Sequence, residues 1–381
     1  MRSLRAAAVL AAFSAALAVQ PAASATVGAT PVRSASVDGT VVATARSGSV
    51  IYLAGSFTRV TDSTGTHPRR NLAAVSAVTG RVLPWSPSTN NTVYAVTVSA
   101  GRVFAGGSFT RANGVPVTRL VELYASTGRL VRSFRPRLDY RVRALALSPT
   151  TLYAGGRFTT VNGRHRAHLA AFSRSTGTLR SWAPRADKSV RVLRRRGPQL
   201  FVGGAFRSVN GVAHTNNVAV LDASRGSVYR SFSSPVHYLV TDIRLTRDRV
   251  FIAKAGPGGA VVATGNKGRV AWGRSFDGDV DALTILDGVL YAGGHFENRC
   301  ATNSVSASNG DCLSSGEVRA PRLAAISLTG TFGTWSPAAD SKVGVLTLSS
   351  VPSLHRLAAG GAFATFHGTQ AQAGFALFRT P

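Results

Sequence analysis

The feature that most constrains this chain is a short run of residues that recurs about every 50 positions. In each copy a strand-like apolar segment ends in small residues and a phenylalanine, as in Leu152-Tyr-Ala-Gly-Gly-Arg-Phe158. Self-similarity at such a period is typical of repeat architectures. The copies occupy residues 51–57, 103–109, 152–158, 200–206, 290–296 and 357–363, with a worn copy at 250–256. The sequence therefore predicts seven copies of one structural unit.

The residues between the copies contain the turns and short strands expected of an antiparallel sheet. A turn, often Asn-Gly, follows the phenylalanine, and a short apolar strand such as His168-Leu-Ala-Ala-Phe172 comes next. A second turn and a strand that ends in an aromatic residue complete the unit. This aromatic slot holds all four tryptophans of the chain: Trp85, Trp182, Trp272 and Trp335. Four short strands per unit, with no helical pattern between them, predict an all-β fold: a seven-bladed β-propeller of four-stranded antiparallel blades.

The two ends of the repeat predict how the ring closes. The last copy stops after its third strand, near residues 374–379, while residues 27–34 form a spare extended segment before the first inner strand. Donating this segment to the last blade would cover two open sheet edges, which otherwise invite aggregation. We expect a single domain at 26–381, with blades at 36–88, 89–136, 137–184, 185–235, 236–277, 278–337 and 338–381, the last completed by 27–34.

The first 25 residues predict export. Arg2 and Arg5 precede an apolar run at 6–19, which is followed by Ala23-Ser24-Ala25, the layout of a secretory signal peptide at 1–25. The run is too short for a transmembrane anchor. In an oxidising compartment the two cysteines, Cys300 and Cys312, are expected to form a disulfide rather than half of a metal site. We expect a secreted monomer, extracellular or associated with the cell wall.

The combination of Leu-Tyr-Ala-Gly-Gly-x-Phe, Asn-Gly, Leu-Ala-Ala, Thr-Gly and a terminal Trp resembles the delta-60-type repeat propellers common in secreted bacterial proteins. The Gly-Gly pair at the end of the second strand is also kelch-like, whereas the absence of a Trp-Asp dipeptide argues against the WD40 family. The resemblance covers residues 27–381. It implies a propeller of unassigned biochemical function, often in an extracellular or surface protein.

One repeat position gathers acids. The inner strands are aligned on their first valine, taken as Val343 in the last copy. The residue three places earlier is then Asp38, Asn90, Asp139, Asp187, His237, Asp277 or Asp340. This acidic position is expected to surround the mouth of the central channel and to bind ligand there. Alternatively, each side chain fixes the entry into its inner strand through an Asx turn. A rim for Ca²⁺ or a cationic ligand, and catalysis by a carboxylate pair, are further alternatives.

A second candidate feature is an insertion at residues 297–320, where one connection is longer than its counterparts and contains both cysteines. It is expected on the same face as the acidic position. It is either a rim or lid over the channel or a surface insertion that the disulfide holds in place.

The charge is strongly one-sided, with 44 Lys and Arg against 16 Asp and Glu and a formal net charge of +28. Such a field attracts polyanions. The arginines expected to contact them cluster near two predicted inner strands: Arg135, Arg137, Arg141, Arg194, Arg195 and Arg196. For an exported protein we expect an anionic cell-wall polymer or acidic polysaccharide. Nucleic acid is not expected, because Arg/aromatic recognition motifs are absent.

Catalytic motifs are scarce: the chain has no Gly-x-Ser-x-Gly, no His-Glu-x-x-His and no phosphate-binding loop before a helix. The acid/base candidates are Asp277, Asp279, Asp281, His295 and Glu297. No cofactor and no metal site are predicted. We therefore expect a non-enzymatic binding protein that captures a ligand or a protein partner on the acidic face. The alternative is an extracellular carbohydrate-active hydrolase or lyase, which needs two carboxylates facing one pocket.

Overall fold

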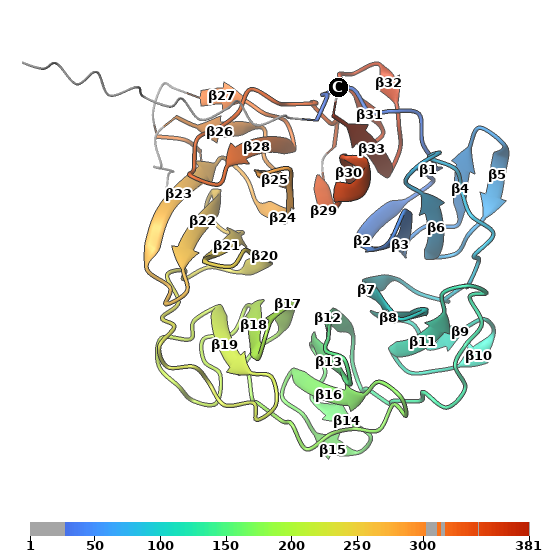
Figure 1. Ribbon diagram of the computed structural model, residues 1–381, viewed down its shortest axis with the longest axis vertical. Helices are drawn as coiled ribbons and strands as arrows, with labels where there is room; N and C mark the ends of the chain where they lie inside the picture. The colour runs from blue at the N-terminus through green and yellow to red at the C-terminus, as the bar shows by residue number, and fades with distance from the viewer. Residues whose placement is uncertain (1–26, 302–310, 314–316, 342, 381) are drawn as a thin grey trace, which may run out of the picture.

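The computed structural model describes residues 27–301, 311–313, 317–341 and 343–380. Within these ranges the chain is all-β, with one 3₁₀ turn at Pro352–Leu354. Figure 1 shows the sheets arranged as a ring around a common centre. The expected signal peptide, residues 1–25, lies outside the described residues. Among the residues described, no helix has the length and apolar character needed to cross a membrane.

In the described part of the chain, seven antiparallel sheets share one strand order, from the centre of the ring outward. The inner strands are β2 (Thr40–Ser47), β7 (Val93–Ser99), β12 (Val142–Leu147), β17 (Val190–Arg196), β20 (Val240–Leu245), β24 (Val280–Leu286) and β29 (Val345–Val351). The second strands, which contain the repeated run, are β3 (Val50–Ser56), β8 (Arg102–Gly107), β13 (Thr151–Gly156), β18 (Gln199–Gly204), β21 (Arg249–Lys254), β25 (Val289–Gly294) and β30 (Arg356–Gly361). The third strands are β6 (Leu72–Ser76), β11 (Leu120–Tyr124), β16 (Leu169–Ser173), β19 (Val218–Asp222), β22 (Gly259–Gly265), β28 (Leu323–Ser327) and β33 (Phe375–Arg379).

The outermost segment of each sheet differs from the sequence expectation. In the described residues a regular fourth strand forms once, as β23 (Val270–Phe276), which pairs with β22 along its length. In the other sheets the segment meets the third strand at a single bridge, such as Val75 with Val82 or Leu123 with Leu130. Six of the sheets are thus three-stranded ladders with an irregular outer segment.

Small hairpins follow the second strands and lie at the outer edge of the ring (Figure 1). They are β4 (Arg59–Asp62) with β5 (Gly65–Pro68), β9 (Arg111–Ala112) with β10 (Val115–Pro116), β14 (Thr160–Val161) with β15 (Arg164–His165), β26 (Asn298–Cys300) with β27 (Glu317–Arg319), and β31 (Thr365–Phe366) with β32 (Gln370–Ala371). The short strand β1 (Ser36–Val37) pairs with β4.

The Gly-Gly pairs set how closely the strands approach. A Cβ on Gly155 would lie 2.5 Å from Cγ1 of Val190, which belongs to the inner strand of the next sheet. A Cβ on Gly156 would lie 2.3 Å from the carbonyl oxygen of Arg141, at the entry of its own inner strand. Any larger side chain would clash with these atoms, so glycine is required at both positions.

The tryptophans join neighbouring sheets. The indole Nε1 of Trp85 donates to the carbonyl oxygen of Tyr124 in the next sheet (3.0 Å), and Trp182 reaches Asp222 in the same way (3.3 Å). Trp85, Trp182 and Trp335 also pack edge-on against a tyrosine of their own second strand, as Trp85 does against Tyr52 with ring centroids 5.0 Å apart, whereas Trp272 packs against Phe251. The aromatic slot therefore contributes both apolar burial and a directed bond between sheets.

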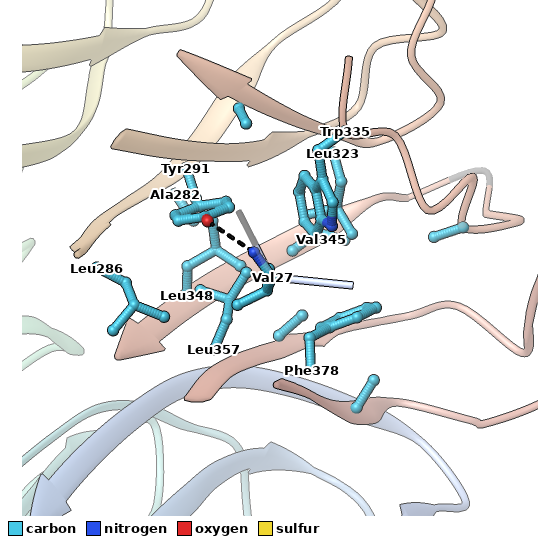
Figure 2. Close-up of a cluster of buried hydrophobic side chains, with 14 of the residues drawn as sticks. Val27, Ala282, Leu286, Tyr291, Leu323, Trp335, Val345, Leu348, Leu357 and Phe378 are labelled. Atoms are coloured by element: carbon cyan, nitrogen blue, oxygen red, sulfur yellow. Dashed lines mark hydrogen bonds between the residues drawn. The ribbon is translucent and has the colours of Figure 1, made fainter. Parts of the chain in front are cut away.

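Residues 27–34 lie beside the last sheet, as the two ends of the repeat predict. Val32 N donates to Leu377 O and Gly28 N donates to Arg379 O, both at 2.8 Å, so the segment runs antiparallel to β33. Figure 2 shows Val27 inside a buried cluster with Tyr291 and Trp335, its backbone nitrogen donating to Tyr291 Oη (3.2 Å). The first and last described segments thus share one core.

The disulfide between Cys300 and Cys312 is confirmed, with Cα atoms 5.4 Å apart. The insertion that contains it includes the hairpin β26–β27, and β26 pairs with the outermost strand β23 through Phe276 and Arg299. Its described part therefore lies beside the outer strand of a sheet, which of the two alternatives favours the surface insertion over the rim or lid. Residues 302–310 and 314–316 of the insertion lie outside the described residues.

Candidate functional site

The acidic position has a definite structural partner. Asp38 Oδ1 accepts hydrogen bonds from the backbone nitrogens of Thr58 (2.8 Å) and Arg59 (3.0 Å), just past the phenylalanine of its own repeat. Asn90 Oδ1 makes the same pair of bonds with Thr110 and Arg111, both at 2.9 Å. Equivalent bonds link Asp139 to Thr159, Asp187 to Arg207, Asp277 to Glu297 and Asn298, and Asp340 to Ala364 and Thr365.

These bonds differ from the expected Asx turn, because the partners lie about 20 residues further along the chain. The side chain ties the loop after the second strand to the entry of the inner strand. Burial alone would raise the pKa of Asp38, Asp139 and Asp340, but the hydrogen bonds outweigh it and lower the pKa of all three. The fold thus holds the carboxylates of Asp38, Asp139 and Asp340 in their charged form.

Two members of the set depart from the pattern. In the last sheet the strand register aligns Val345, not Val343, with the first valine of the other inner strands, so Asp340 lies five places before it. At His237 no such bond forms among the described residues. In that sheet Gly256 N instead donates to Asp279 Oδ1 of the following sheet (3.0 Å). None of the seven side chains lines the cavity inside the central channel, whereas Asp187 lines a cavity that opens where the inner strands begin; their place around the mouth of the channel stays a prediction.

We predict that Asp139→Ala lowers the free energy of unfolding by about 0.5–1 kcal/mol, because it removes bonds from Thr159 that are exposed to solvent. Asp139→Asn should cost less, since Asn90 makes the same bonds naturally. The depressed pKa of Asp139 adds stability above the unfolded pKa of about 3.9, and this stability is lost as the pH falls through the folded pKa. Urea unfolding at neutral pH and near pH 3 tests this: equal losses for Ala and Asn at neutral pH contradict it.

The central channel is lined by a different position of the repeat. Each of the seven described inner strands has a β-bulge directly after its first aligned valine, as between Val142 and Ala144 in β12. A bulge re-aims one side chain. The bulged residues, here called the bulge ring, are Val42, Tyr94, Arg143, Arg191, Thr241, Asp281 and Leu346. All except Asp281 belong to the lining of a channel cavity of about 130 Å³.

The bulge ring is electrostatically uneven. Arg143 and Arg191 come from neighbouring inner strands, and burial followed by repulsion from Arg191 and Arg141 lowers the pKa of Arg143 to about 10. Burial also lowers the pKa of Arg191, against the attraction of Asp281 and Asp279. Burial and the neighbouring Asp279 raise the pKa of Asp281 to about 7, although Arg191 opposes them. The channel therefore has a cationic side and an acidic side.

Further along the channel, Asp242 forms a buried ionic network, here called the Asp242 network. Its Oδ1 accepts from Arg194 Nη2 (2.6 Å) and from Arg244 Nη1 (3.1 Å). Its Oδ2 accepts from the backbone nitrogen of Leu283 (3.0 Å) in the next sheet. Burial lowers the pKa of Arg244 to about 10, with a further contribution from Arg194. The network joins strands β17, β20 and β24 at the channel wall.

The arginines expected to contact polyanions are not brought together. Arg135 and Arg137 are exposed before β12, and Arg141 stacks over Tyr140, with its guanidinium carbon 4.9 Å from the ring centroid. Arg194, Arg195 and Arg196 end β17 and so lie toward the opposite face of the ring. Arg194 is engaged by Asp242, and Arg196 donates to the carbonyl oxygen of Thr246 (2.8 Å).

A second cavity opens where the inner strands begin. It has a volume of about 320 Å³ and is lined by Arg143, Arg157, His168, Asp187, Lys188, Ser189, Arg191 and Ala205. We call it the mouth pocket. It combines two bulge-ring arginines with Arg157, the variable residue of the Gly-Gly-x-Phe run, and with His168, which directly precedes Leu-Ala-Ala. No group of three or more His, Cys, Asp or Glu side chains suited to a metal ion occurs among the described residues.

Solved structures share this architecture. The chain superimposes on the WD40 β-propeller domain of Doa1 with a TM-score of 0.53 and 12% identity, covering 92% of this chain and 97% of that domain. It also superimposes on the computationally designed protein Ika8 with a TM-score of 0.51 and 14% identity, covering 90% of this chain and 98% of that one. The chain has a β-propeller fold.

The likeness of these propellers extends to the fold alone, because their identity to this chain is low. No protein-family model matches the chain, and no curated protein matches it. The expectation of a propeller is confirmed, while the resemblance to delta-60-type repeats stays a prediction.

Sequence analysis missed Tyr94 and the Asp242 network at the channel, and Arg157 and His168 at the mouth pocket. The signal that could have found them is positional. Each residue occupies the same place in its repeat as the other members of its set, although the residue types differ from repeat to repeat.

Proposed function

We propose that the chain is an exported, non-enzymatic binding protein that holds an anionic polymer of the cell envelope on the face where its inner strands begin. Its scaffold is a single seven-bladed propeller at residues 26–381, left after removal of the signal peptide 1–25 and closed by residues 27–34. The aspartates of the acidic position hold the loops around this face in place, and arginines contact the polymer.

The closed ring is supported by the contact between the last and first sheets. A Cβ on Gly360 of the last sheet would lie 2.7 Å from Cγ1 of Val41 in the first inner strand, the relation that Gly155 has to Val190. The segment 27–34 then supplies the outer segment of the last sheet through its bonds to β33.

The observation that carries the proposal is the excess of basic over acidic residues in the chain, together with the three arginines and the lysine that line the mouth pocket on this face. Ion pairs among the described residues engage Arg102, Arg194, Arg244 and Arg322, none of which lines the mouth pocket. Since the chain has 44 basic and 16 acidic residues, most of its arginines have no acid to neutralise them. A polyanion would neutralise several at once and release its own counterions.

The test is binding to isolated cell walls and to a soluble polyuronate at about 50 mM and about 500 mM salt. We expect strong binding at low salt and loss at high salt. Arg137→Gln/Arg141→Gln should lower the slope of log affinity against log salt by about 1–2. The matched control is Arg164→Gln/Arg230→Gln, which removes the same charge from exposed residues away from the channel.

Binding that does not change with salt, or an equal loss in the control variant, contradicts the proposal. Release of reducing ends from the polysaccharide, lost in Asp281→Asn, would instead favour the hydrolase. That alternative depends on the neighbouring carboxyl groups of Asp279 and Asp281, because the raised pKa of Asp281 suits a general acid.

A further inference from the structure

The mouth pocket gathers cations from three separate elements. Arg143 and Arg191 follow the first residues of β12 and β17, and Arg157 follows β13. Lys188 lies between Asp187 and Ser189 at the entry to β17. Repulsion acts between Arg143 and each of Arg191 and Arg157. Because these cations lie close together despite their mutual repulsion, the pocket carries uncompensated positive charge that a bound anion would neutralise.

Aromatic rings hold two of these groups by their faces. The Arg143 guanidinium carbon lies 5.0 Å from the Tyr94 ring centroid, and that of Arg157 lies 5.6 Å from the Tyr140 centroid. A cation over an aromatic face is attracted by the quadrupole of the ring. The two rings therefore help to hold Arg143 and Arg157 beside the pocket.

A buried polar atom in the same pocket lacks a partner. His168 Nδ1 is buried and has no hydrogen-bond partner among the described residues, although its ring lines the cavity. Burial lowers the pKa of His168, against the attraction of Asp187 and Asp139 and with the repulsion of Arg157. Because this nitrogen is closed to solvent, His168 senses charge in the pocket rather than contacting a bound group through Nδ1.

One carboxylate, that of Asp187, lines the pocket, and its negative charge opposes the binding of an anion. Asp187 Oδ1 accepts from Arg207 N (2.8 Å), and its Oδ2 accepts from Ser208 Oγ (3.4 Å). These bonds direct the charge of Asp187 toward the loop after β18. Asp279 and Asp281, at the entry of β24 two sheets further round the ring, attract Arg191, which makes Arg143 and Arg157 the stronger attractors of an anion.

We infer that the mouth pocket binds a phosphate group, with Arg143, Arg157 and Arg191 as its donors. A tetrahedral oxyanion offers acceptor oxygens in several directions, which suits guanidinium groups on three different elements better than the two oxygens of a carboxylate. A cavity of about 320 Å³ also leaves room for a group attached to the phosphate. This inference rests on the proposed function and names the chemistry of its ligand: a phosphate carried by a polymer, or free phosphate.

The experiment is isothermal titration calorimetry of the full propeller with inorganic phosphate at constant ionic strength. We expect saturable binding, weakened at least about tenfold by Arg143→Gln/Arg191→Gln and by Arg157→Gln. Arg143→Lys/Arg191→Lys keeps the charge but loses the planar fork, so it should also weaken binding. Arg164→Gln/Arg230→Gln is the charge-matched control and should bind phosphate as the unchanged chain does. Thermal unfolding checks the fold, and Arg157 is exposed, so its variant should fold even where the double variant does not.

A second readout places the ligand. Phosphate should shift the ring resonances of His168, which His168→Asn identifies by their loss; Asn71 and Asn217 occupy the equivalent position in other sheets. Titration without saturation, Lys variants that bind as well as arginine, or a control that weakens equally would overturn the inference.

Three ligands separate this inference from the proposed function. Inorganic phosphate and a phosphodiester polymer should compete for one site, whereas a polyuronate should not displace phosphate. If phosphate does not compete with the polymer and the Arg143→Gln/Arg191→Gln variant still binds the polymer, the inference is wrong and the proposed function stands. If phosphate binds saturably but no polymer binds, the phosphate site stands and the proposed function is wrong.

Discussion

Asp242→Asn should lower the free energy of unfolding by about 3–5 kcal/mol, because it leaves two guanidinium groups at the channel wall without their counter-charge. Asp242 is 5% exposed and accepts from Arg194, Arg244 and the backbone of Leu283. The amide has nearly the same shape, so the loss would come from charge rather than from a cavity. The melting temperature should fall by on the order of 10 °C.

Two variants make the result specific. Asp248→Asn removes an acid that is exposed and bonded only through Thr246 Oγ1 among the described residues, and it should change stability by less than about 0.5 kcal/mol. Arg194→Met/Asp242→Leu/Arg244→Met removes all three charges together and should recover much of the lost stability. A loss below about 1 kcal/mol for Asp242→Asn would show that the network contributes little.

Removal of residues 27–34 should destabilise the last sheet and cause self-association. The segment buries Val27 and Pro31, each worth about 1.5–3 kcal/mol as an upper estimate. Its loss also strips the donors from Leu377 O and Arg379 O and the acceptor from Trp335 Nε1. The exposed edge of β33 would then be free to pair with another chain. Thermal unfolding and size-exclusion chromatography measure the two effects.

A peptide of residues 26–35 added in trans should restore the monomer and part of the stability, since it can add a strand to the open edge. In the full chain, Val32→Pro removes the donor to Leu377 and should reproduce a smaller loss, while Thr30→Ala, at an exposed side chain, should not. A truncated chain that stays monomeric with an unchanged melting temperature would contradict the closed ring.

The sequence predicted the propeller because its signals are local. Gly155 and Gly156 lie in the repeated run itself, and their need for space follows from backbone contacts that recur in each sheet. The tryptophan slot and the disulfide are likewise visible in residue type and spacing. The irregular outer segments were not predicted, because an aromatic at the end of an apolar run reads as a strand whether it forms a full ladder or a single bridge.

The candidate site was harder to predict, because its bulges have no residue signature. Valine, tyrosine, arginine, threonine, aspartate and leucine all occupy the bulged position, so no composition bias reveals it. The partners of the acidic position lie about 20 residues away, beyond the reach of a local turn rule. The last copy was misaligned because the strand starts two residues later, at Val345, after Gly344 with its positive φ of 98°.

In each inner strand the valine that packs the propeller and the bulged residue that faces its axis are different positions. The valines before the bulge are fully buried, and five of the seven pack against a glycine of the preceding sheet, as Val190 does against Gly155. The bulged residues do not make this contact, although Thr241 Oγ1 donates to the carbonyl oxygen of Val280 in the next sheet. Their side chains therefore vary in type around one aperture while the packing of the sheets stays the same. Substitutions in the bulge ring, arising in evolution or in a combinatorial library, could change the selectivity of the channel without altering the propeller that encloses it.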